Sequence, residues 1–168
     1  MAAEPQDRLR LEAVRKGFRG PAGEVAVLRG VSLSVGVGEF GVITGPSGSG
    51  KTTLLTAAGL LMPAEAGQVW FDGCEMSSLG EGPLAEVRKH GVGMVFQKSC
   101  LMPHRSVLDN VQFRFRYLPH DAREAQRRSG EALERVGLAE KAQRTARLRY
   151  ASEMQRVAVA RALALPPK

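Results

Sequence analysis

Glycine, lysine and threonine occur in residues 45–53 at a spacing that can hold phosphate groups. The stretch fits the pattern G-x-x-x-x-G-K-[ST]. Glycines let the backbone turn so that successive N–H groups point at phosphate oxygens, and the start of a following helix adds a favourable dipole. Lys51 can then reach the β- and γ-phosphates, and the Thr52 hydroxyl can ligate a magnesium ion. The candidate phosphate-binding residues are Gly45, Pro46, Ser47, Gly48, Ser49, Gly50, Lys51, Thr52 and Thr53.

A phosphate loop of this kind lies between a strand and a helix, and both flanks fit that requirement. Residues 40–44 are a short apolar run, which predicts a buried strand. Residues 52–61 are mostly apolar with no breaker before Gly59, which predicts a helix. An accidental Gly- and Ser-rich turn would have no reason to carry these two flanks, so phosphate binding is the favoured interpretation.

The rest of the chain changes from strand-like to helix-like patterns along its length. Strands are predicted over residues 9–18, 25–28, 31–35, 67–73 and 92–96, and helices over residues 83–90, 106–117, 121–136 and 155–165. Ser152 and Gln155 form a capping-box pattern, which predicts Ser152 as the N-cap of the last helix. The expected fold class is therefore mixed α/β.

Composition indicates one globular domain with a basic surplus. The 168 residues carry a net charge of +7, and residues 112–149 hold ten basic against five acidic side chains. Such a surplus could face nucleic acid or anionic lipid, but solvated faces of amphipathic helices explain it more simply. Cys74 and Cys100 form no CxxC pair and the histidines have no metal-ligand spacing, so we expect a reducing cytoplasm. No apolar run approaches the roughly 18 residues that span a bilayer.

Four further stretches, taken with the phosphate loop, resemble the nucleotide-binding subunit of an ABC transporter. The resemblance extends from residue 9 to residue 168. It rests on Phe18, on Val95-Phe96-Gln97, on residues 101–111 and on residues 155–163. It implies an α/β P-loop NTPase of ABC type with an N-terminal antiparallel β subdomain and a helical subdomain. Residues 9–97 would form the β subdomain and P-loop core, and residues 98–165 the helical subdomain and signature helix, of a single domain over residues 1–168.

The resemblance also implies roles for individual residues, with ATP and Mg as cofactors. Phe18 lies about where the family places an aromatic ring under adenine; a core aromatic at a strand end is the alternative. Gln97 matches the Q-loop glutamine, whose amide can touch magnesium and the attacking water. Lys51 and Gln97 are thus the expected catalytic residues, and Thr52 and Gln97 the expected magnesium contacts.

Partners follow from the same resemblance. Residues 101–111 look like the stretch that faces a transmembrane permease subunit, with Ser106 and Asp109 in place of Thr and Glu. The family works as a dimer with a second ATP-binding subunit, peripheral on the cytoplasmic face of the cell membrane. Residues 18–28, 45–50 and 54–59 look most like the branch of lipoprotein-release and macrolide-export ATPases.

Two departures from the family pattern concern catalysis. The signature Leu-Ser-Gly-Gly-Gln/Glu corresponds to Arg149-Tyr150-Ala151-Ser152-Glu153, where only the last position agrees. The family's magnesium-coordinating aspartate, catalytic glutamate and switch histidine have no counterpart, and no Asp-Glu pair occurs in the sequence. The chain is therefore expected to be truncated before the Walker B strand, as a fragment or a decayed gene product, and to be catalytically incompetent alone.

Two other functions stay open at this point. A non-catalytic nucleotide-binding or regulatory module would suit the altered signature and the missing acids. A soluble ABC ATPase acting on nucleic acid would suit the basic surplus, although the transporter-like residues 101–111 make nucleic acid an unlikely partner.

Overall fold

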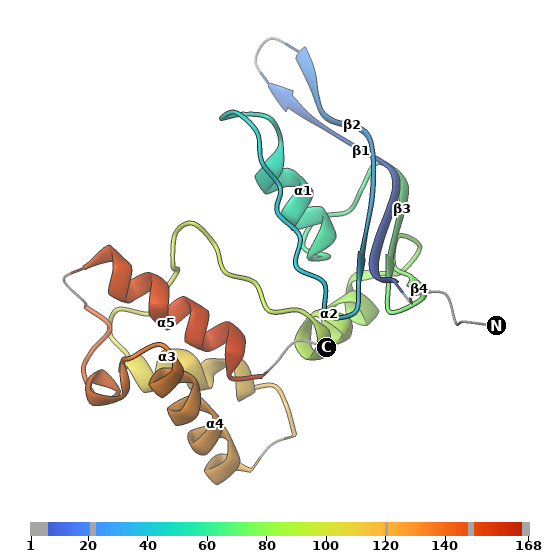
Figure 1. The fold of residues 1–168 in the computed structure, drawn as a ribbon. Coiled ribbons are helices and arrows are strands. Elements are labelled where there is room, and N and C mark those ends of the chain that lie inside the picture. The colour runs from blue at the N-terminus through green and yellow to red at the C-terminus, as the bar shows by residue number, and fades with distance from the viewer. Residues whose placement is uncertain (1–6, 21–22, 120, 148–149, 166–168) are drawn as a thin grey trace. The chain divides into compact units, whose positions relative to one another are not determined.

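The computed structural model describes residues 7–20, 23–119, 121–147 and 150–165. The chain divides into two compact units, Met1–Ala85 and Glu86–Lys168 (Figure 1). The boundary falls within helix α2 (Glu81–Gly91), the helix predicted over residues 83–90. It lies earlier than the boundary after residue 97 that the sequence suggests.

An antiparallel sheet of four strands forms much of the first unit, in the order β2-β1-β3-β4. The strands predicted over residues 9–18 and 67–73 are confirmed. The two strands predicted over residues 25–28 and 31–35 are one strand, because both segments pair with the same neighbour. Gly30 links them with a φ of +91°, which glycine tolerates. The strands are β1 (Asp7–Gly20), β2 (Gly23–Gly36), β3 (Ala66–Phe71) and β4 (Cys74–Glu75).

Helix α1 (Lys51–Ala58) packs against β1 and β2 (Figure 1). It buries Leu54 and Ala57, and Leu28 of β2 is buried in the same unit. Full burial of a leucine contributes about 1.5–3 kcal/mol, so these contacts hold the start of the helix to the sheet. Gly59 is the C-cap, and the helix predicted over residues 52–61 therefore ends earlier than expected.

Two predicted strands are wrong. Residues 40–44 have no regular secondary structure, and Phe40 and Val42 are 89% and 70% exposed. Residues 92–96 are also irregular, with Val95 and Phe96 on the surface. An apolar run becomes a strand only when a neighbouring strand accepts and donates its backbone hydrogen bonds. The described residues pair no strand with either segment.

The second unit is helical, and its core lies among three helices. Val107, Val111, Leu133 and Val157 are fully buried there, with Leu138 beside them. The helix predicted over residues 106–117 consists of an α-helix followed by a 3-10 turn, and the helix over residues 121–136 is confirmed. The elements are α3 (Val107–Gln112), η1 (Phe113–Phe115), α4 (Ala122–Arg135), η2 (Ala139–Lys141) and α5 (Ala151–Leu163).

The predicted N-cap of the last helix is wrong. Helix α5 begins at Ala151 with Tyr150 as its N-cap, so Ser152 lies in the first turn. The backbone N–H groups of Glu153 and Met154 both donate to the Tyr150 carbonyl, at 3.0 and 3.2 Å. Gln155, the other half of the predicted capping box, donates instead to the Phe96 carbonyl at 3.2 Å.

Candidate functional site

The phosphate loop is built around three glycines with positive φ. Gly45, Gly48 and Gly50 have φ values of +154°, +79° and +89°. Gly50 is the N-cap of α1 in the left-handed conformation. A Cβ on Gly50 would lie 2.9 Å from Val27 Cγ1, closer than real side chains approach. Both its conformation and its contact with β2 therefore require glycine at the point where the loop enters the helix.

Lys51 folds back over the loop that precedes it. Its Nζ donates to the Gly45 carbonyl at 2.9 Å, to the Pro46 carbonyl at 2.6 Å and to Ser49 Oγ at 3.4 Å. The ammonium group is thus held at the loop by acceptors that the loop itself supplies. Phosphate oxygens are acceptors of the same kind with a full negative charge, so they can compete for these hydrogen bonds.

The start of α1 suits an anion. Its first turn contains no acidic residue, and the N-terminal backbone N–H groups carry partial positive charge. Thr52 is exposed in that first turn and Thr53 is half-buried, while Thr56 Oγ1 donates to both of their carbonyls at 3.0 and 2.9 Å. The Thr52 hydroxyl is the kind of oxygen ligand that magnesium prefers, so the residues fit a magnesium-bound phosphate.

Phe18 lies near the end of β1 and is 44% exposed, so its alternative interpretation as a core aromatic is wrong. It pairs with Val25 of β2, two residues before Val27, the residue against which Gly50 packs. The Lys16 ammonium lies 5.8 Å from the ring centroid. An exposed ring on the strand pair that supports the phosphate loop is available to stack on a flat ligand.

Gln97 belongs to the second unit, in the irregular segment that comprises residues 92–100, and it is exposed. Two residues of α5 hold this segment, one that the sequence assigned to a capping box (Gln155) and one to which it gave no individual role (Arg161). Arg161 of α5 donates to the Ser99 and Cys100 carbonyls, and Gln155 donates to the Phe96 carbonyl. Nothing in the sequence around these two residues of α5 distinguishes them from solvated helix residues, so these contacts could not be predicted.

Asn110 is the fully buried polar residue of the 101–111 stretch. Its Nδ2 donates to the Met102 and Ser106 carbonyls at 3.0 and 2.9 Å, and its Oδ1 accepts from the Met102 N–H at 2.7 Å. Ser106 and Asp109 form a capping box at the start of α3. Asn110 is therefore the polar centre that holds the loop preceding α3 against that helix.

The surface beside this stretch has a hollow of about 190 Å³. Two arginines and the exposed ring of Phe113 give it a cationic and partly apolar lining. Tyr117 stands edge-on to Phe113, with ring centroids 6.2 Å apart. The lining residues are Met102, Arg105, Asp109, Gln112, Phe113 and Arg116.

The altered signature lies at the start of α5, except for Arg149, which is outside the described residues. Tyr150 is 64% exposed, and Ala151 and Ser152 are exposed beside it. Glu153 is buried and forms an ion pair with Lys141. The one position that agrees with the family signature is therefore engaged inside the second unit, while the three described positions that differ are exposed.

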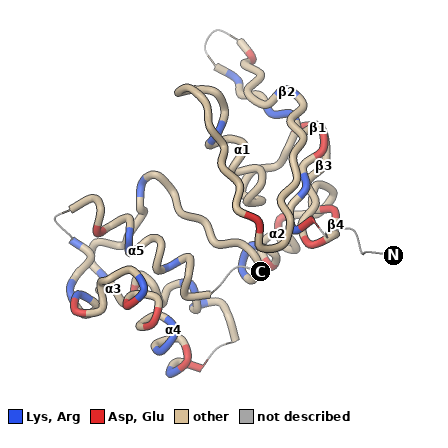
Figure 2. Tube along the Cα trace, in the orientation of Figure 1, with Lys and Arg blue, Asp and Glu red and all other residues tan. Residues whose placement is uncertain are grey.

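The basic surplus of residues 112–149 is partly neutralised along α4, where red and blue segments alternate in Figure 2. Glu124 forms ion pairs with Arg127 and Arg128, and Arg127 pairs also with Glu131. Hydrogen bonds from Arg127 and then Arg128 lower the pKa of Glu124 to about 2. These ion pairs, which are exposed or half-buried, support a solvated helix face more than an anion-binding one.

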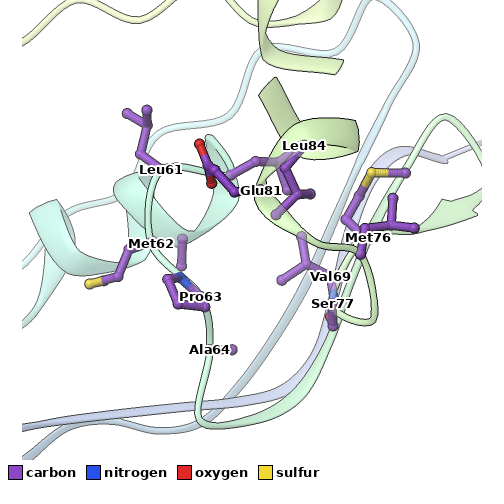
Figure 3. Close-up of a pocket in the computed structure, with 12 residues that line it drawn as sticks. Leu61, Met62, Pro63, Ala64, Val69, Met76, Ser77, Glu81 and Leu84 are labelled. Atoms are coloured by element: carbon purple, nitrogen blue, oxygen red, sulfur yellow. The ribbon is translucent and has the colours of Figure 1, made fainter. Parts of the chain in front are cut away.

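A second hollow, of about 270 Å³, lies in the first unit but not at the phosphate loop (Figure 3). Leu60, Leu61 and Met62 line it beyond the C-terminal end of α1, with Met76 and Leu84 among the others. Its lining is mostly apolar and offers little to a phosphate. Within the described residues no group of three metal-ligating side chains occurs, and no helix has the length and apolarity to cross a bilayer.

Known proteins are similar to this chain in sequence and in fold. A family model described as ABC transporter matches residues 28–168. An uncharacterized ABC transporter ATP-binding protein of Thermotoga maritima is 44% identical over 147 residues, which covers 86% of this chain and 63% of that protein. The lipoprotein-releasing system ATP-binding protein LolD 2 of Caulobacter vibrioides is 41% identical over 160 residues, covering 95% of this chain and 70% of its own length.

Among solved structures, a dimeric post-hydrolysis state of the ATP-binding cassette MJ0796, bound to ADP and Pi, has a TM-score of 0.88 and 33% identity. The match covers 95% of this chain and 70% of that one. The chain therefore spans between 63% and 70% of the length of these three proteins. Since the family model extends from β2 through the phosphate loop to the helical unit, the chain belongs to the ABC transporter family, as its ATP-binding domain.

Proposed function

We propose that this protein is the ATP-binding subunit of an ABC transporter and that it binds Mg-ATP through residues 45–53. The carrying observation is the loop itself, in which Gly50 can only be glycine and Lys51 is already held over the loop carbonyls. Lys51 would exchange these carbonyls for β- and γ-phosphate oxygens. Because Lys51 already lies over the loop, the loop needs little rearrangement to receive phosphate.

Other residues would complete the nucleotide site. The Thr52 hydroxyl and the Gln97 amide would contact magnesium, and the Phe18 ring would stack on adenine, a contact worth about 1–3 kcal/mol. Magnesium, when bound, neutralises charge that develops on the phosphate oxygens. Exposure of Thr52, Phe18 and Gln97 supports these roles, since each side chain is accessible to a ligand.

The transport role is proposed from the relatives. Their names include a lipoprotein-releasing system, and on that basis the protein would energise export or extraction of a substrate through a transmembrane permease subunit. The hollow beside α3 would receive the permease, because Arg105, Arg116 and Phe113 suit a segment with acidic and apolar side chains. The protein would act as a dimer, peripheral at the cytoplasmic face of the membrane.

Calorimetry with a series of nucleotides tests the binding proposal. With magnesium present, ATP and ADP are expected to bind, whereas AMP should bind at least about tenfold more weakly because it lacks the phosphates that Lys51 contacts. Titrations of AMP and of adenosine, each with magnesium present, are the matched controls for binding through the base alone. Equal affinity for AMP and ATP would contradict binding through the phosphate loop.

A second candidate function is a non-catalytic nucleotide-binding module, and Tyr150 favours it. In the family, signature serine and glycines of one subunit approach the γ-phosphate bound by the other. Here an exposed tyrosine and two residues with Cβ atoms occupy that place. The 168 residues also contain no Asp-Glu pair. We therefore propose that these 168 residues bind ATP without hydrolysing it on their own.

Restoring the signature distinguishes the two functions. The chain is extended with the C-terminal part of the Caulobacter relative, and Tyr150→Ser, Ala151→Gly and Ser152→Gly are combined. ATPase activity is expected to rise about tenfold or more, since a single lost donor to a transition-state charge typically costs more than that. Tyr117→Ser, at another exposed tyrosine of the second unit, is the control. No gain over the control would mean that the altered signature is harmless.

A further inference from the structure

The irregular segment that comprises residues 92–100 is held by side chains instead of by a sheet. Four of its backbone carbonyls accept hydrogen bonds from three long side chains of the second unit. The donors and acceptors are Arg114 Nη2 to Val92 at 2.9 Å, Gln155 Nε2 to Phe96 at 3.2 Å, Arg161 Nη2 to Ser99 at 3.0 Å and Arg161 Nη1 to Cys100 at 3.1 Å. These carbonyls lie on both sides of Gln97.

Arg161 makes the central contact. Its two terminal nitrogens bind successive carbonyls, which uses the planar fork of the guanidinium group. The side chain is half-buried, and burial lowers its pKa. No carboxylate pairs with Arg161 in the described residues. A cation placed there without an acid is stabilised chiefly by the carbonyls of the segment.

Arg114 repeats the arrangement from the 3-10 turn η1. Burial, followed by the charge of Arg161, lowers the pKa of its guanidinium group. Its Nε is buried and finds no hydrogen-bond partner in the described part of the chain. Two arginines that repel each other therefore bind the same stretch of backbone. Apolar side chains could pack against the segment without that repulsion.

Two backbone features show how closely the segment is fitted. A Cβ on Gly93 would lie 3.2 Å from the Ala162 carbonyl of α5, so the segment packs directly on that helix. Cys100 has a φ of +47°, which is uncommon for a residue other than glycine. Arg161 donates to the carbonyl of the same residue, and this hydrogen bond helps to hold Cys100 in that conformation.

We propose that Arg161 and Gln155 are positioning residues that fix Gln97 from α5. They donate to backbone carbonyls on both sides of Gln97, and in this way they limit where its amide can point. Loss of Arg161 would free the carbonyls of Ser99 and Cys100 and leave the segment without its strongest contact. The functional consequence rests on the proposed function of Gln97, whose amide would contact magnesium and the water that attacks the terminal phosphate of ATP.

Proteolysis by an endoproteinase specific for lysine tests the physical part without nucleotide. Lys98 is an exposed site inside the segment, whereas Lys89 and Lys141 lie in helical elements and report on unfolding of the second unit. In Arg161→Ala, cleavage after Lys98 should accelerate about tenfold or more, because cleavage follows the population of the open segment. Cleavage after Lys89 and Lys141 should change much less.

Arg156→Ala is the matched control. Arg156 also lies on α5 and donates to a carbonyl, that of Val136 at 3.0 Å, and among the described residues it makes no hydrogen bond to the segment. It should leave cleavage after Lys98 near the wild-type rate. An equal acceleration after all three lysines, or an equal effect of Arg156→Ala, would overturn the proposal.

Nucleotide affinity tests the positioning role. Gln97→Ala and Arg161→Ala should each weaken Mg-ATP binding severalfold and leave Mg-ADP binding unchanged, and the double variant should be no weaker than either single variant. Normal ATP affinity in Arg161→Ala, with a loss in Gln97→Ala, would overturn the positioning role. No loss in Gln97→Ala would overturn both that role and the proposed function of Gln97, with the proteolysis result unaffected.

Discussion

Replacing Asn110 by alanine is expected to lower the free energy of unfolding of the second unit by about 2–4 kcal/mol. Asn110 is fully buried, and its side chain makes three hydrogen bonds to the backbone of the loop before α3. Alanine would leave the Met102 N–H without its acceptor, which typically costs about 1–3 kcal/mol. It would also remove one hydrogen bond from each of two carbonyls that keep a backbone donor, at about 0.5–1.5 kcal/mol each. Partial access of water to the loop keeps the sum below the upper limit.

Urea denaturation followed by far-ultraviolet circular dichroism measures this loss. Gln112→Ala is the matched control, because it removes a similar amide from the same helix at a position that is only half-buried. That control should change the free energy of unfolding by less than about 0.5 kcal/mol. Equal unfolding midpoints for Asn110→Ala and the control would contradict a structural role for Asn110.

The parts of the fold that depend on local patterns could be predicted from the sequence. Helix α4 follows from an apolar spacing that ends at Gly137, whose φ of +67° is the stop that glycine predicts. Strand β1 follows from its weak alternation, and the start of α1 from the phosphate motif. Each of these signals lies within a dozen residues of the element that it specifies.

The errors concern features that depend on distant partners. Residues 40–44 and 92–96 are apolar runs, but their composition does not say whether another strand lies beside them. Ser152 matches a capping box, yet the amide that should complete the box binds the Phe96 carbonyl instead. A local pattern was thus overruled by a contact between residues far apart in the sequence.

The candidate site shows the same division. The motif identified Gly50 and Lys51. The structure adds that Val27 Cγ1 of β2 leaves no room for a Cβ at position 50. Asn110 and Arg161 could not be assigned a role in advance, because a polar residue on a helix is usually solvated. Both side chains donate hydrogen bonds to backbone carbonyls near irregular segments. Such contacts have no sequence signature.

Lys51→Ala is the second large expected effect, a loss of about 1.5–3 kcal/mol in Mg-ATP binding. The Lys51 ammonium is held over the loop by three acceptors, and it is the cation that would face the β- and γ-phosphates. Loss of one charge-assisted hydrogen-bonding group of this kind weakens binding by roughly 10- to 150-fold. Gly50 and the helix start would still supply backbone donors, so binding should be weakened and not abolished.

Calorimetric titration of Mg-ATP into the wild-type protein, Lys51→Ala and Lys89→Ala tests the central claim most directly. Lys89 is a half-buried lysine of α2 that pairs with Glu86 and is not part of the loop sequence, so its removal controls for the loss of one positive charge. ATP binding through residues 45–53 predicts wild-type affinity in Lys89→Ala and a 10- to 150-fold loss in Lys51→Ala. Equal affinity of all three proteins for Mg-ATP would contradict it.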